Sequence, residues 1–503
     1  MWARDAERGA RDVAVLDVGS NSVRLVIYRL EGRAIWTVFN EKVLAGLGRG
    51  LAQTGRLSPD GAVQALAALR RFKMVLDAAK PAAIYTAATA AVREASDGPV
   101  FVEQVRRETG GRQGISIRVL SGEEEAYYSA LGVAAGAPDA TGVVGDLGGS
   151  SLELIPIRHG VPGRGVTLPL GPFALGAPRP MDAAAARARC DEALSGLDPS
   201  LQGGTLYAVG GAWRALGLLQ MSMSDYPLQI VHQYELGAGA ALDAARVVAR
   251  QSKSSLERSG ALARKRAETV PYAALVMEQV LERLGLERVS LSAFGVREGL
   301  IFEAMAPELR RLDPLVEGCA AFGAREGVAV RLAPALEAWL APLWRRLPGL
   351  FEGDRDQVLL SAASRLADVG ARLHPDHRAD LAYDLVLRAP IAGQTHPERA
   401  FLAAAIFSRY TASQKSDRSE AARLLSPERL RRARALGSAL RLGCDLSGRS
   451  PELLSASSLE LHAGAVSLKV GRAQADMLLG EQTRKRFATL ADALEVEPRL
   501  DVD

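Results

Sequence analysis

The first apolar runs of the chain are separated by short polar breaks, a pattern that predicts three successive β-strands. Valine, leucine, isoleucine and aromatic residues dominate each run, as is usual in strands. The runs are residues 13–19 (VAVLDVG), 22–30 (SVRLVIYRL) and 33–43 (RAIWTVFNEKV). Breaks this short predict an antiparallel meander.

After the meander the pattern changes to helices alternating with strands. Ser58, Pro59 and Asp60 form a helix start signal, and the apolar residues that follow recur at helical spacing. Later segments predict a strand at 82–91, a helix at about 100–108, a strand at 115–120 and a helix from residue 122. This is the element order of a ribonuclease-H-like α/β unit.

The first turn of the chain has a second copy. A shift of 129 residues lays 15–27 (VLDVGSNSVRLVI) on 144–156 (VGDLGGSSLELIP). In this alignment Asp17, Gly19, Ser22 and Leu25 match Asp146, Gly148, Ser151 and Leu154. A second meander follows, with its third strand expected in 165–175, and alternating segments continue to about residue 306. We therefore expect two ribonuclease-H-like domains, 1–138 and 139–310.

The rest of the chain has a different character. Residues 311–445 are rich in alanine, leucine and arginine and carry no strand signal, which predicts an all-helical domain. Residues 446–503 alternate in SLELHAGAVSLKV and then turn helical, which predicts a small α+β domain. The expected fold class is therefore α/β, with two helical or mixed domains after the repeat.

Composition excludes several classes of protein. The 503 residues suffice for roughly three domains. The formal net charge of +4 is spread along the chain, which argues against a nucleic-acid-binding tail but does not exclude a basic groove inside a cleft. Three scattered cysteines fit a reducing compartment, and no apolar stretch reaches 18 residues. We expect a cytoplasmic protein without a membrane segment.

The paired turns predict a phosphate site. A small-residue turn after a strand-end aspartate leaves backbone N–H groups free to cradle phosphate oxygens. One such turn alone would more often be a simple hairpin, but two in register favour a grip on a phosphate chain. The candidate phosphate-binding residues are Asp17, Gly19, Ser20, Asn21, Ser22, Gly148, Gly149, Ser150 and Ser151.

From residue 13 to 305 the chain resembles the exopolyphosphatase and guanosine pentaphosphate phosphohydrolase family, which belongs to the actin, sugar kinase and Hsp70 superfamily. Six motifs carry the resemblance in order: DVGSNS, TAAVREA (89–95), SGEEEA (121–126), DLGGSSLEL (146–154), AVGGAWRAL (208–216) and GVREGL (295–300). The resemblance implies two actin-like domains followed by a helical domain related to the HD phosphohydrolases.

The resemblance also assigns roles within these motifs. It makes Glu125 the general base and Glu124 a supporting or metal-water acid, although acidic residues also favour a helix N-terminus and Ser121 stands at capping-box spacing from Glu124. Arg93 would hold the terminal phosphate and offset charge in the transition state. A surface salt bridge is the alternative for this arginine.

The metal site follows from the same resemblance. Asp146 and Glu153 would position Mg²⁺, with Mn²⁺ as a substitute, and this sparse carboxylate set suits Mg²⁺. An exposed strand position is the alternative for Glu153. Gly210, Gly211 and Arg214 lie in a strand-to-helix turn that either lines the same cleft or only packs closely.

The implied function is hydrolysis of the terminal phosphoanhydride of inorganic polyphosphate, which releases orthophosphate. Guanosine pentaphosphate is the alternative substrate, and the resemblance also implies a homodimer. Two functions of a different kind stay open: a phosphotransferase of the same superfamily and a non-catalytic polyphosphate or alarmone sensor. The intact Glu125, Asp146 and Glu153 argue against the sensor.

Several residues depart from the family pattern. Ser150 replaces a common glycine, Leu152 a usual threonine, and Asp97 a frequent asparagine. In the helical domain Ala367 takes the place of the histidine of the His-Asp pair, so we expect binding, gating or dimerisation there rather than metal-dependent chemistry. His374, His377 and His396 are expected to be solvated loop histidines rather than a metal cluster.

Overall fold

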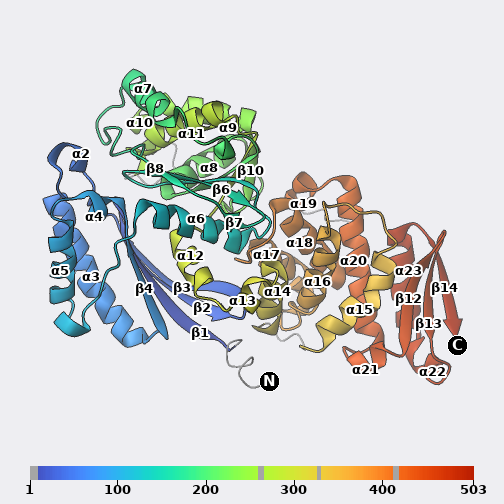
Figure 1. The fold of residues 1–503 in the computed structure, drawn as a ribbon. Coiled ribbons are helices and arrows are strands. Elements are labelled where there is room, and N and C mark those ends of the chain that lie inside the picture. The colour runs from blue at the N-terminus through green and yellow to red at the C-terminus, as the bar shows by residue number, and fades with distance from the viewer. Residues whose placement is uncertain (1–8, 259–265, 326–329, 412–418, 503) are drawn as a thin grey trace. The chain divides into compact units, whose positions relative to one another are not determined.

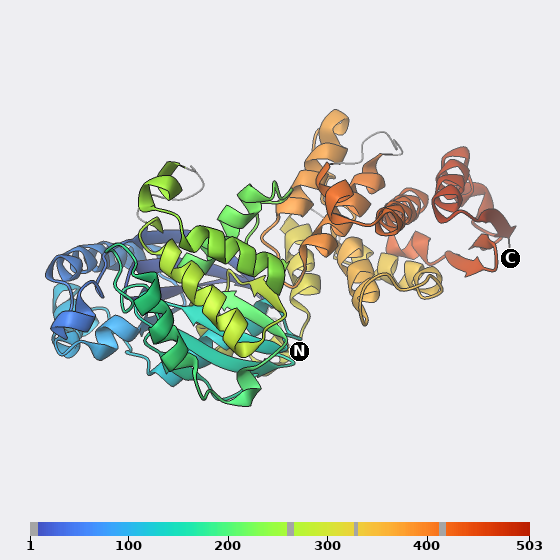
Figure 2. The same ribbon diagram turned by 90° about the horizontal axis from the view of Figure 1, so that it is seen from above.

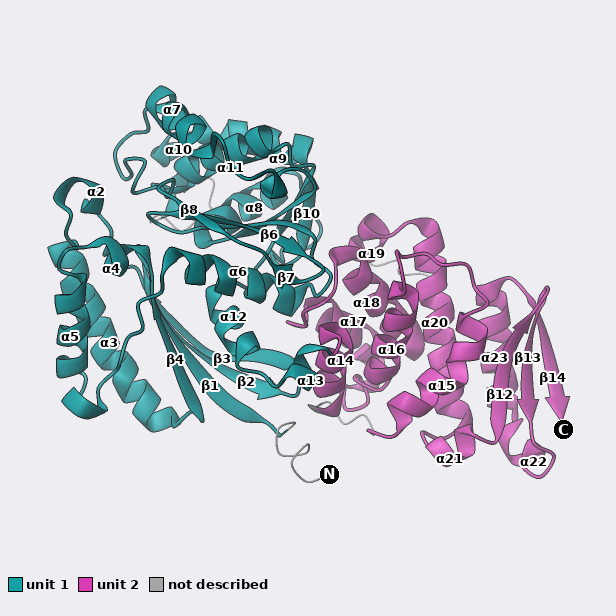
Figure 3. Cartoon of the chain, viewed as in Figure 1, with its two compact units in different colours: residues 1–311 teal, residues 312–503 magenta. Residues whose placement is uncertain are grey.

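The computed structural model describes residues 9–258, 266–325, 330–411 and 419–502. The chain forms two compact units, residues 1–311 and 312–503 (Figure 3). Each unit has its own sheets and helices, so each is described by itself.

The first unit begins with a four-stranded sheet in the order β3-β2-β1-β4 (Figure 1). Its strands are β1 (Arg11–Val18), β2 (Val23–Glu31), β3 (Ala34–Val43) and β4 (Ala83–Ala88). The meander β1-β2-β3 is antiparallel as predicted, and β4 is parallel to β1. Helix α3 (Pro59–Ala79) starts where predicted, since the Ser58 hydroxyl accepts a hydrogen bond from the Gly61 amide, and its apolar stripe packs on the sheet.

The predicted strand at 115–120 is wrong. The segment lies beside the edge strand β4 but pairs with it only through a single bridge between Ala88 and Val119, and helix α4 (Ala90–Glu94) follows β4 directly. Beside it the side chain of Thr86, not its backbone, bonds Ser116 and Arg118. Helix α5 (Gly98–Glu108) matches the helix expected nearby.

A second, seven-stranded sheet follows within the same unit. Its order is β10-β11-β9-β5-β6-β7, with β8 also paired to β6. The strands are β5 (Gly142–Leu147), β6 (Leu152–Arg158), β7 (Val161–Pro162), β8 (Val166–Leu168), β9 (Thr205–Val209), β10 (Tyr234–Gly237) and β11 (Arg288–Leu291). Strand β8 is much shorter than the strand expected in 165–175, because Pro169 and Pro172 cannot donate to a ladder.

The two sheets share a central arrangement. In each, a first strand pairs antiparallel with the second and parallel with a later one: β1 with β2 and β4, and β5 with β6 and β9. Helices α9 (Ala238–Ala249) and α11 (Val270–Leu284) cover one face of the second sheet, as Figure 2 shows from above. The mixed α/β sheets expected from the sequence are therefore present.

Two helices join the sheets. Helices α6 (Gly122–Gly136) and α12 (Val296–Glu303) share one apolar core with residues of β1, β2, β5 and β6. The helices approach backbone to backbone, because a Cβ at Gly299 would lie 1.9 Å from the carbonyl oxygen of Tyr128. This contact fixes α6, whose first turn carries the SGEEEA motif.

The second unit is helical and ends in a small sheet. Its longer helices are α14 (Pro314–Arg325), α15 (Leu332–Trp344), α16 (Arg355–Leu366), α17 (Arg378–Arg388), α18 (His396–Tyr410) and α20 (Pro427–Leu446). Strands β12 (Ser457–His462), β13 (Ala465–Val470) and β14 (Glu497–Val502) form the sheet, with α23 (Glu481–Leu494) between the last two. No helix in the described parts of the chain combines the length and apolarity needed to cross a membrane.

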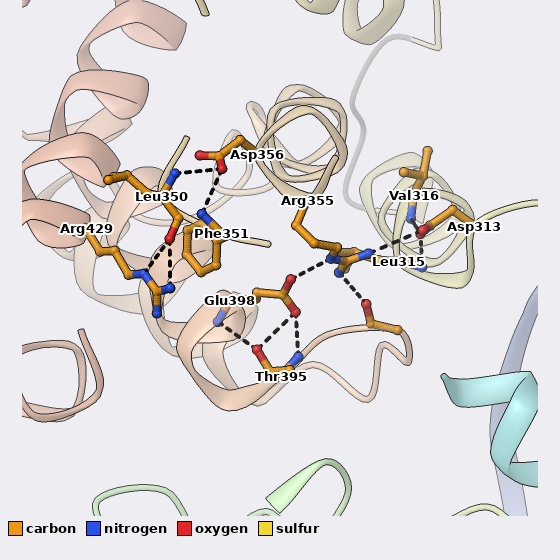
Figure 4. Close-up of polar contacts among 11 residues, drawn as sticks. Asp313, Leu315, Val316, Leu350, Phe351, Arg355, Asp356, Thr395, Glu398 and Arg429 are labelled. Carbon is orange, nitrogen blue, oxygen red and sulfur yellow. Dashed lines mark hydrogen bonds and ion pairs between the residues drawn. The ribbon is translucent and has the colours of Figure 1, made fainter. Parts of the chain in front are cut away.

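A network of polar contacts ties the helices of the second unit together (Figure 4). The Arg355 guanidinium donates to Glu398 at 2.6 Å and to the Gly393 carbonyl at 2.8 Å, and it lies 3.5 Å from Asp313. Glu398 is buried and also closes the capping box of α18 with Thr395. One guanidinium therefore links the starts of three helices.

Ala367, which stands in the place of the histidine of the His-Asp pair, packs in the interior of the second unit. Ala367 is fully buried, and the neighbouring Asp368 lies 3.1 Å from Arg449 and 3.7 Å from Arg409. The histidines behave differently from one another. His374 is exposed as expected, whereas His396 is buried at the start of α18, which corrects the expectation of a solvated side chain.

Candidate active site

One cavity of the first unit brings both predicted turns together. It encloses about 170 Å³ and lies at the carboxyl ends of β1, β5 and β9. The predicted residues that line it are Asp17, Gly19, Ser20, Asn21, Ser22, Glu125, Asp146, Gly148, Gly149, Ser151, Gly210 and Gly211. Arg93, Glu124, Ser150 and Glu153 are not among the lining residues.

The two turns have the same backbone hydrogen bond. The Gly19 amide donates to the Ser22 carbonyl and the Gly148 amide to the Ser151 carbonyl, both at 2.9 Å. The turns also touch, since a Cβ at Gly149 would lie 3.0 Å from that of Ser20. Their residues therefore meet at one place, as a grip on neighbouring phosphates requires.

Glu125 enters the cavity from the first turn of α6. The side chain is 6% exposed, and its Oε2 accepts a hydrogen bond of 2.9 Å from Arg93 Nη1. Burial, together with the nearby charges of Asp146 and Asp17, raises the pKa of Glu125 to about 7 against the opposing effect of Arg93. A carboxyl with that pKa can accept a proton near neutral pH.

Arg93 lies behind Glu125 rather than at the cavity surface. It comes from the last turn of α4, and its Nη1 also donates to the Leu120 carbonyl at 3.0 Å. Its Nη2 is buried without a hydrogen bond among the described residues and lies 3.7 Å from Glu94. In this arrangement Arg93 orients Glu125 from outside the cavity.

Glu124 points away from the cavity. Its carboxylate accepts a hydrogen bond from the Ser121 amide at 2.8 Å and one from Arg118 at 2.5 Å. The Ser121 hydroxyl in turn accepts from the Glu124 amide, which completes a capping box. Glu124 therefore caps the helix, as its spacing from Ser121 allowed. The expectation that it belongs to the reacting groups is corrected, because its side chain does not line the cavity.

Asp146 and Glu153 are directly opposite each other in the β5-β6 pair. The Ser129 hydroxyl donates to Asp146, whose pKa is raised by burial. Glu153 is 1% exposed, so the alternative of an exposed strand position is wrong. Burial and the charges of Glu125 and Asp146 raise its pKa well above the usual range against the opposing effect of the Ser151 hydroxyl, and neither of its oxygens has a hydrogen bond of normal geometry with the described residues.

Among the described residues, five cationic side chains line the same cavity: Arg24, Lys42, Arg214, Arg266 and Arg297. Arg297 Nη1 lies 3.1 Å from Asp17 Oδ2, so this aspartate is paired. Burial, followed by the charge of Arg297, lowers the pKa of Arg214 to about 10. Except for Arg214, sequence reasoning missed these residues, which are scattered over four segments. The repeat offered one signal, because the shift of 129 residues aligns Arg24 with Glu153.

The remaining predicted positions have local roles. Gly210 lines the cavity and also packs closely, since a Cβ there would lie 2.4 Å from the Leu147 carbonyl oxygen. The buried Ser150 lines a separate cavity of about 260 Å³. Leu152 is fully buried, and Asp97 accepts a hydrogen bond from the Leu57 amide at 2.9 Å. Asp97 therefore fixes the loop before α3 instead of facing the cavity.

Two family models and several known proteins match the chain. The model of the Ppx/GppA phosphatase family matches residues 26–308, and that of the exopolyphosphatase C-terminal domain matches 344–496. Exopolyphosphatase 1 of Mycobacterium tuberculosis is 26% identical over 322 residues, which are 61% of this chain and 90% of the relative. The guanosine-5'-triphosphate,3'-diphosphate pyrophosphatase of Aeromonas hydrophila is 26% identical over 299 residues, 58% of each chain.

Solved structures show the same fold. The Ppx/GppA family member of Aquifex aeolicus has a TM-score of 0.50 at 25% identity and covers 58% of this chain and 97% of its own. An exopolyphosphatase of Cytophaga hutchinsonii has a TM-score of 0.54 at 22% identity, with coverage of 59% and 98%. The chain therefore belongs to the Ppx/GppA phosphatase family and is a phosphoanhydride hydrolase.

Proposed function

We propose that the protein is a metal-dependent exopolyphosphatase, which hydrolyses the terminal phosphoanhydride of inorganic polyphosphate and releases orthophosphate. The observation that carries the proposal is the composition of the cavity. Carboxylates of Glu125 and Asp146, two N–H-rich turns and five cationic side chains share one space of about 170 Å³. Such a space accepts a phosphate chain and places a proton acceptor beside it.

The lining also favours polyphosphate over guanosine pentaphosphate. Among the described residues that line the cavity none is aromatic, and the apolar ones are leucine, proline, valine and alanine. A guanine base is commonly held by stacking on aromatic side chains. Guanosine pentaphosphate is therefore the second substrate to test.

In the proposed reaction Glu125 takes a proton from the attacking water. The water oxygen bonds to the terminal phosphorus while the bridging P–O bond breaks, and its electron pair stays on the shortened chain. Arg93 keeps the Glu125 carboxylate oriented through the hydrogen bond from its Nη1. The turns hold the chain through backbone N–H groups.

The acidic pair fits a divalent cation. Glu153 has two buried oxygens without a hydrogen bond of normal geometry among the described residues, next to Asp146 and Glu125, and a cation would neutralise this charge. Among the described residues no three potential ligands of the His, Cys, Asp or Glu type converge, but Mg²⁺ needs only one or two carboxylates with substrate oxygens and water. Bound there, Mg²⁺ would offset the charge of the phosphoryl group during transfer.

The test is orthophosphate release with Mg²⁺ from long-chain polyphosphate and, separately, from guanosine pentaphosphate. Glu125→Gln should lower release at least a hundredfold while substrate binding survives. Glu123→Gln is the matched control, because Glu123 lies in the same helical turn but is 74% exposed. Release by the Glu125 variant at the wild-type rate would overturn the general-base assignment.

The same assay distinguishes hydrolysis from phosphoryl transfer and from binding without turnover. A phosphotransferase would transfer the phosphoryl group to an acceptor hydroxyl and release no orthophosphate. A sensor would bind both substrates and turn over neither. Faster release from guanosine pentaphosphate than from polyphosphate would reverse the proposed order of substrates.

A further inference from the structure

We infer that Ser129 is a positioning residue for Asp146, and that helices α6 and α12 together fix the strand-end aspartates of both sheets. The inference rests on the proposed function, in which Asp146 helps to hold Mg²⁺, and it deepens that function. Ser129 is not among the residues that line the cavity, so it acts through Asp146 and does not touch the substrate.

Ser129 is a polar residue in a buried and mostly apolar stretch of α6. After Glu125 the other buried residues of this helix are alanine, leucine, valine, glycine and one tyrosine, and Ser129 itself is 0% exposed. A buried hydroxyl is costly unless it has a hydrogen-bond partner. Its partner is Asp146 on β5, to which the hydroxyl donates. This serine therefore makes a contact between two elements.

The contact leaves one oxygen of Asp146 to the cavity. The Ser129 hydroxyl binds Oδ2, and no second donor from the described residues reaches the Asp146 carboxylate. Asp146 also lines the cavity, so Oδ1 is the oxygen that it offers there. Ser129 lies one helical turn after Glu125 on the same face of α6. One helix therefore places the proposed general base and orients the carboxylate proposed for the metal.

The equivalent aspartate of the first sheet is held by a group of different charge. Asp17 Oδ2 lies 3.1 Å from Nη1 of Arg297, which belongs to the first turn of α12. A guanidinium neutralises the carboxylate that it orients, whereas a hydroxyl orients it without an opposing charge. Of these two aspartates, Asp146 is thus the one whose negative charge is left for a divalent cation, and Asp17 is already paired.

The two helices that hold these aspartates also fix each other. A Cβ at Gly132 of α6 would lie 2.1 Å from the carbonyl oxygen of Gly295, the residue before α12. This is a second close approach of the two backbones, beside the one between Gly299 and Tyr128. Two such contacts leave neither helix room to slide along the other. Asp146 and Asp17 are therefore held in one frame, although they belong to different sheets.

Magnesium binding to the substrate-free protein tests the assignment. Calorimetry measures the affinity, and the heat that Glu153→Gln abolishes identifies the site. Ser129→Ala should weaken Mg²⁺ binding there about tenfold, because a residue that orients a metal ligand commonly contributes about ten- to a hundredfold. Ser364→Ala is the matched control, since Ser364 is a fully buried helical serine of the second unit.

Kinetics give a second readout for the same variant. Orthophosphate release by Ser129→Ala should fall at low Mg²⁺ and recover as Mg²⁺ is raised, because the metal site is weakened and not removed. At saturating Mg²⁺ the KM for long-chain polyphosphate should match that of wild type. A raised KM under these conditions would show that Ser129 acts on substrate binding, which would overturn the assignment.

A purely structural role of Ser129 would give a different result. It would lower the melting temperature of Ser129→Ala and leave the Mg²⁺ Kd of the folded protein unchanged. Alanine is the best helix former, so the variant keeps α6. Should it nevertheless fail to fold, Ser129→Cys takes its place, because a thiol is of similar size and only a weak donor, and it should also weaken Mg²⁺ binding.

Two outcomes would overturn the assignment in the calorimetry: an unchanged Mg²⁺ affinity in the folded variant, and no Mg²⁺ binding by wild type. Failure of the proposed function would look different. If Ser129→Ala weakens Mg²⁺ binding while wild type releases no orthophosphate from either substrate, the proposed function fails and the role of Ser129 stands.

Discussion

Replacing Glu153 by glutamine tests whether the buried Glu153 carboxylate needs a bound cation to offset its charge. In the metal-free protein this carboxyl is buried beside Glu125 and Asp146 without a hydrogen-bond donor among the described residues. Its pKa in the folded state is therefore above that of the unfolded chain. Above the unfolded pKa, near 4.3, the folded state holds the extra proton, so stability falls as pH rises.

The size of the effect follows from one proton. While Glu153 is protonated in the folded chain and ionised in the unfolded one, the free energy of unfolding falls by about 1.4 kcal/mol per pH unit. Glu153→Gln removes this dependence and should make the metal-free protein more stable than wild type at pH 8. Saturating Mg²⁺, at about 100 times its Kd, should stabilise wild type by about 2.7 kcal/mol and the variant much less.

Hydrogen exchange is the suitable assay, because the two compact units need not unfold together. Peptides that cover β5 and β6 report on the first unit. Wild type and variant are compared at each pH from 5 to 8 in EDTA, so that intrinsic exchange rates cancel. A ratio of exchange rates that stays constant over this range would refute the reasoning. Glu123→Gln serves as the exposed control.

Three more substitutions have defined outcomes. Glu124→Ala should cost about 1 kcal/mol in thermal unfolding through the lost cap, and should lower kcat by loosening Glu125; an unchanged kcat would contradict this link. Arg93→Lys should lower kcat at least tenfold in the release assay, because a shorter ammonium does not reproduce the Nη1 that donates to both Glu125 and the Leu120 carbonyl; wild-type kcat would argue against orientation by Arg93. Arg355→Met should destabilise the second unit by about 3 kcal/mol in urea titration, since it leaves the buried Glu398 without its ion pair; unchanged unfolding would show that the contact drawn in Figure 4 contributes little to stability.

The sequence predicted the parts of the site that lie in short contiguous motifs. Both turns, Glu125 and Asp146 line one cavity, because each follows a recognisable strand end or helix start. Glu124 could not be separated from Glu125 by pattern alone. Adjacent helical residues point in different directions, and only the structure shows which of them faces inward.

Other features depended on contacts between distant segments. Arg266 and Arg297 look like ordinary arginines in the sequence, and only folding brings them to the same cavity as Lys42. The segment 115–120 has a strand-like composition and lies beside the edge strand β4, but the Thr86 side chain takes the hydrogen bonds with Ser116 and Arg118 that a ladder would need. Sequence pattern captures local preference, whereas pairing depends on the side chains of the neighbouring strand.

The capping box at the start of α6 has a consequence for how precisely Glu125, the proposed general base, is placed. Successive residues of an α-helix are rotated by about 100°, so a start shifted by one residue would turn Glu125 away from the cavity and bring a neighbour into its place. Ser121 and Glu124 hold the start in place through reciprocal hydrogen bonds of 3.1 and 2.8 Å. By fixing the residue at which the helix begins, they also fix the direction in which the Glu125 side chain points.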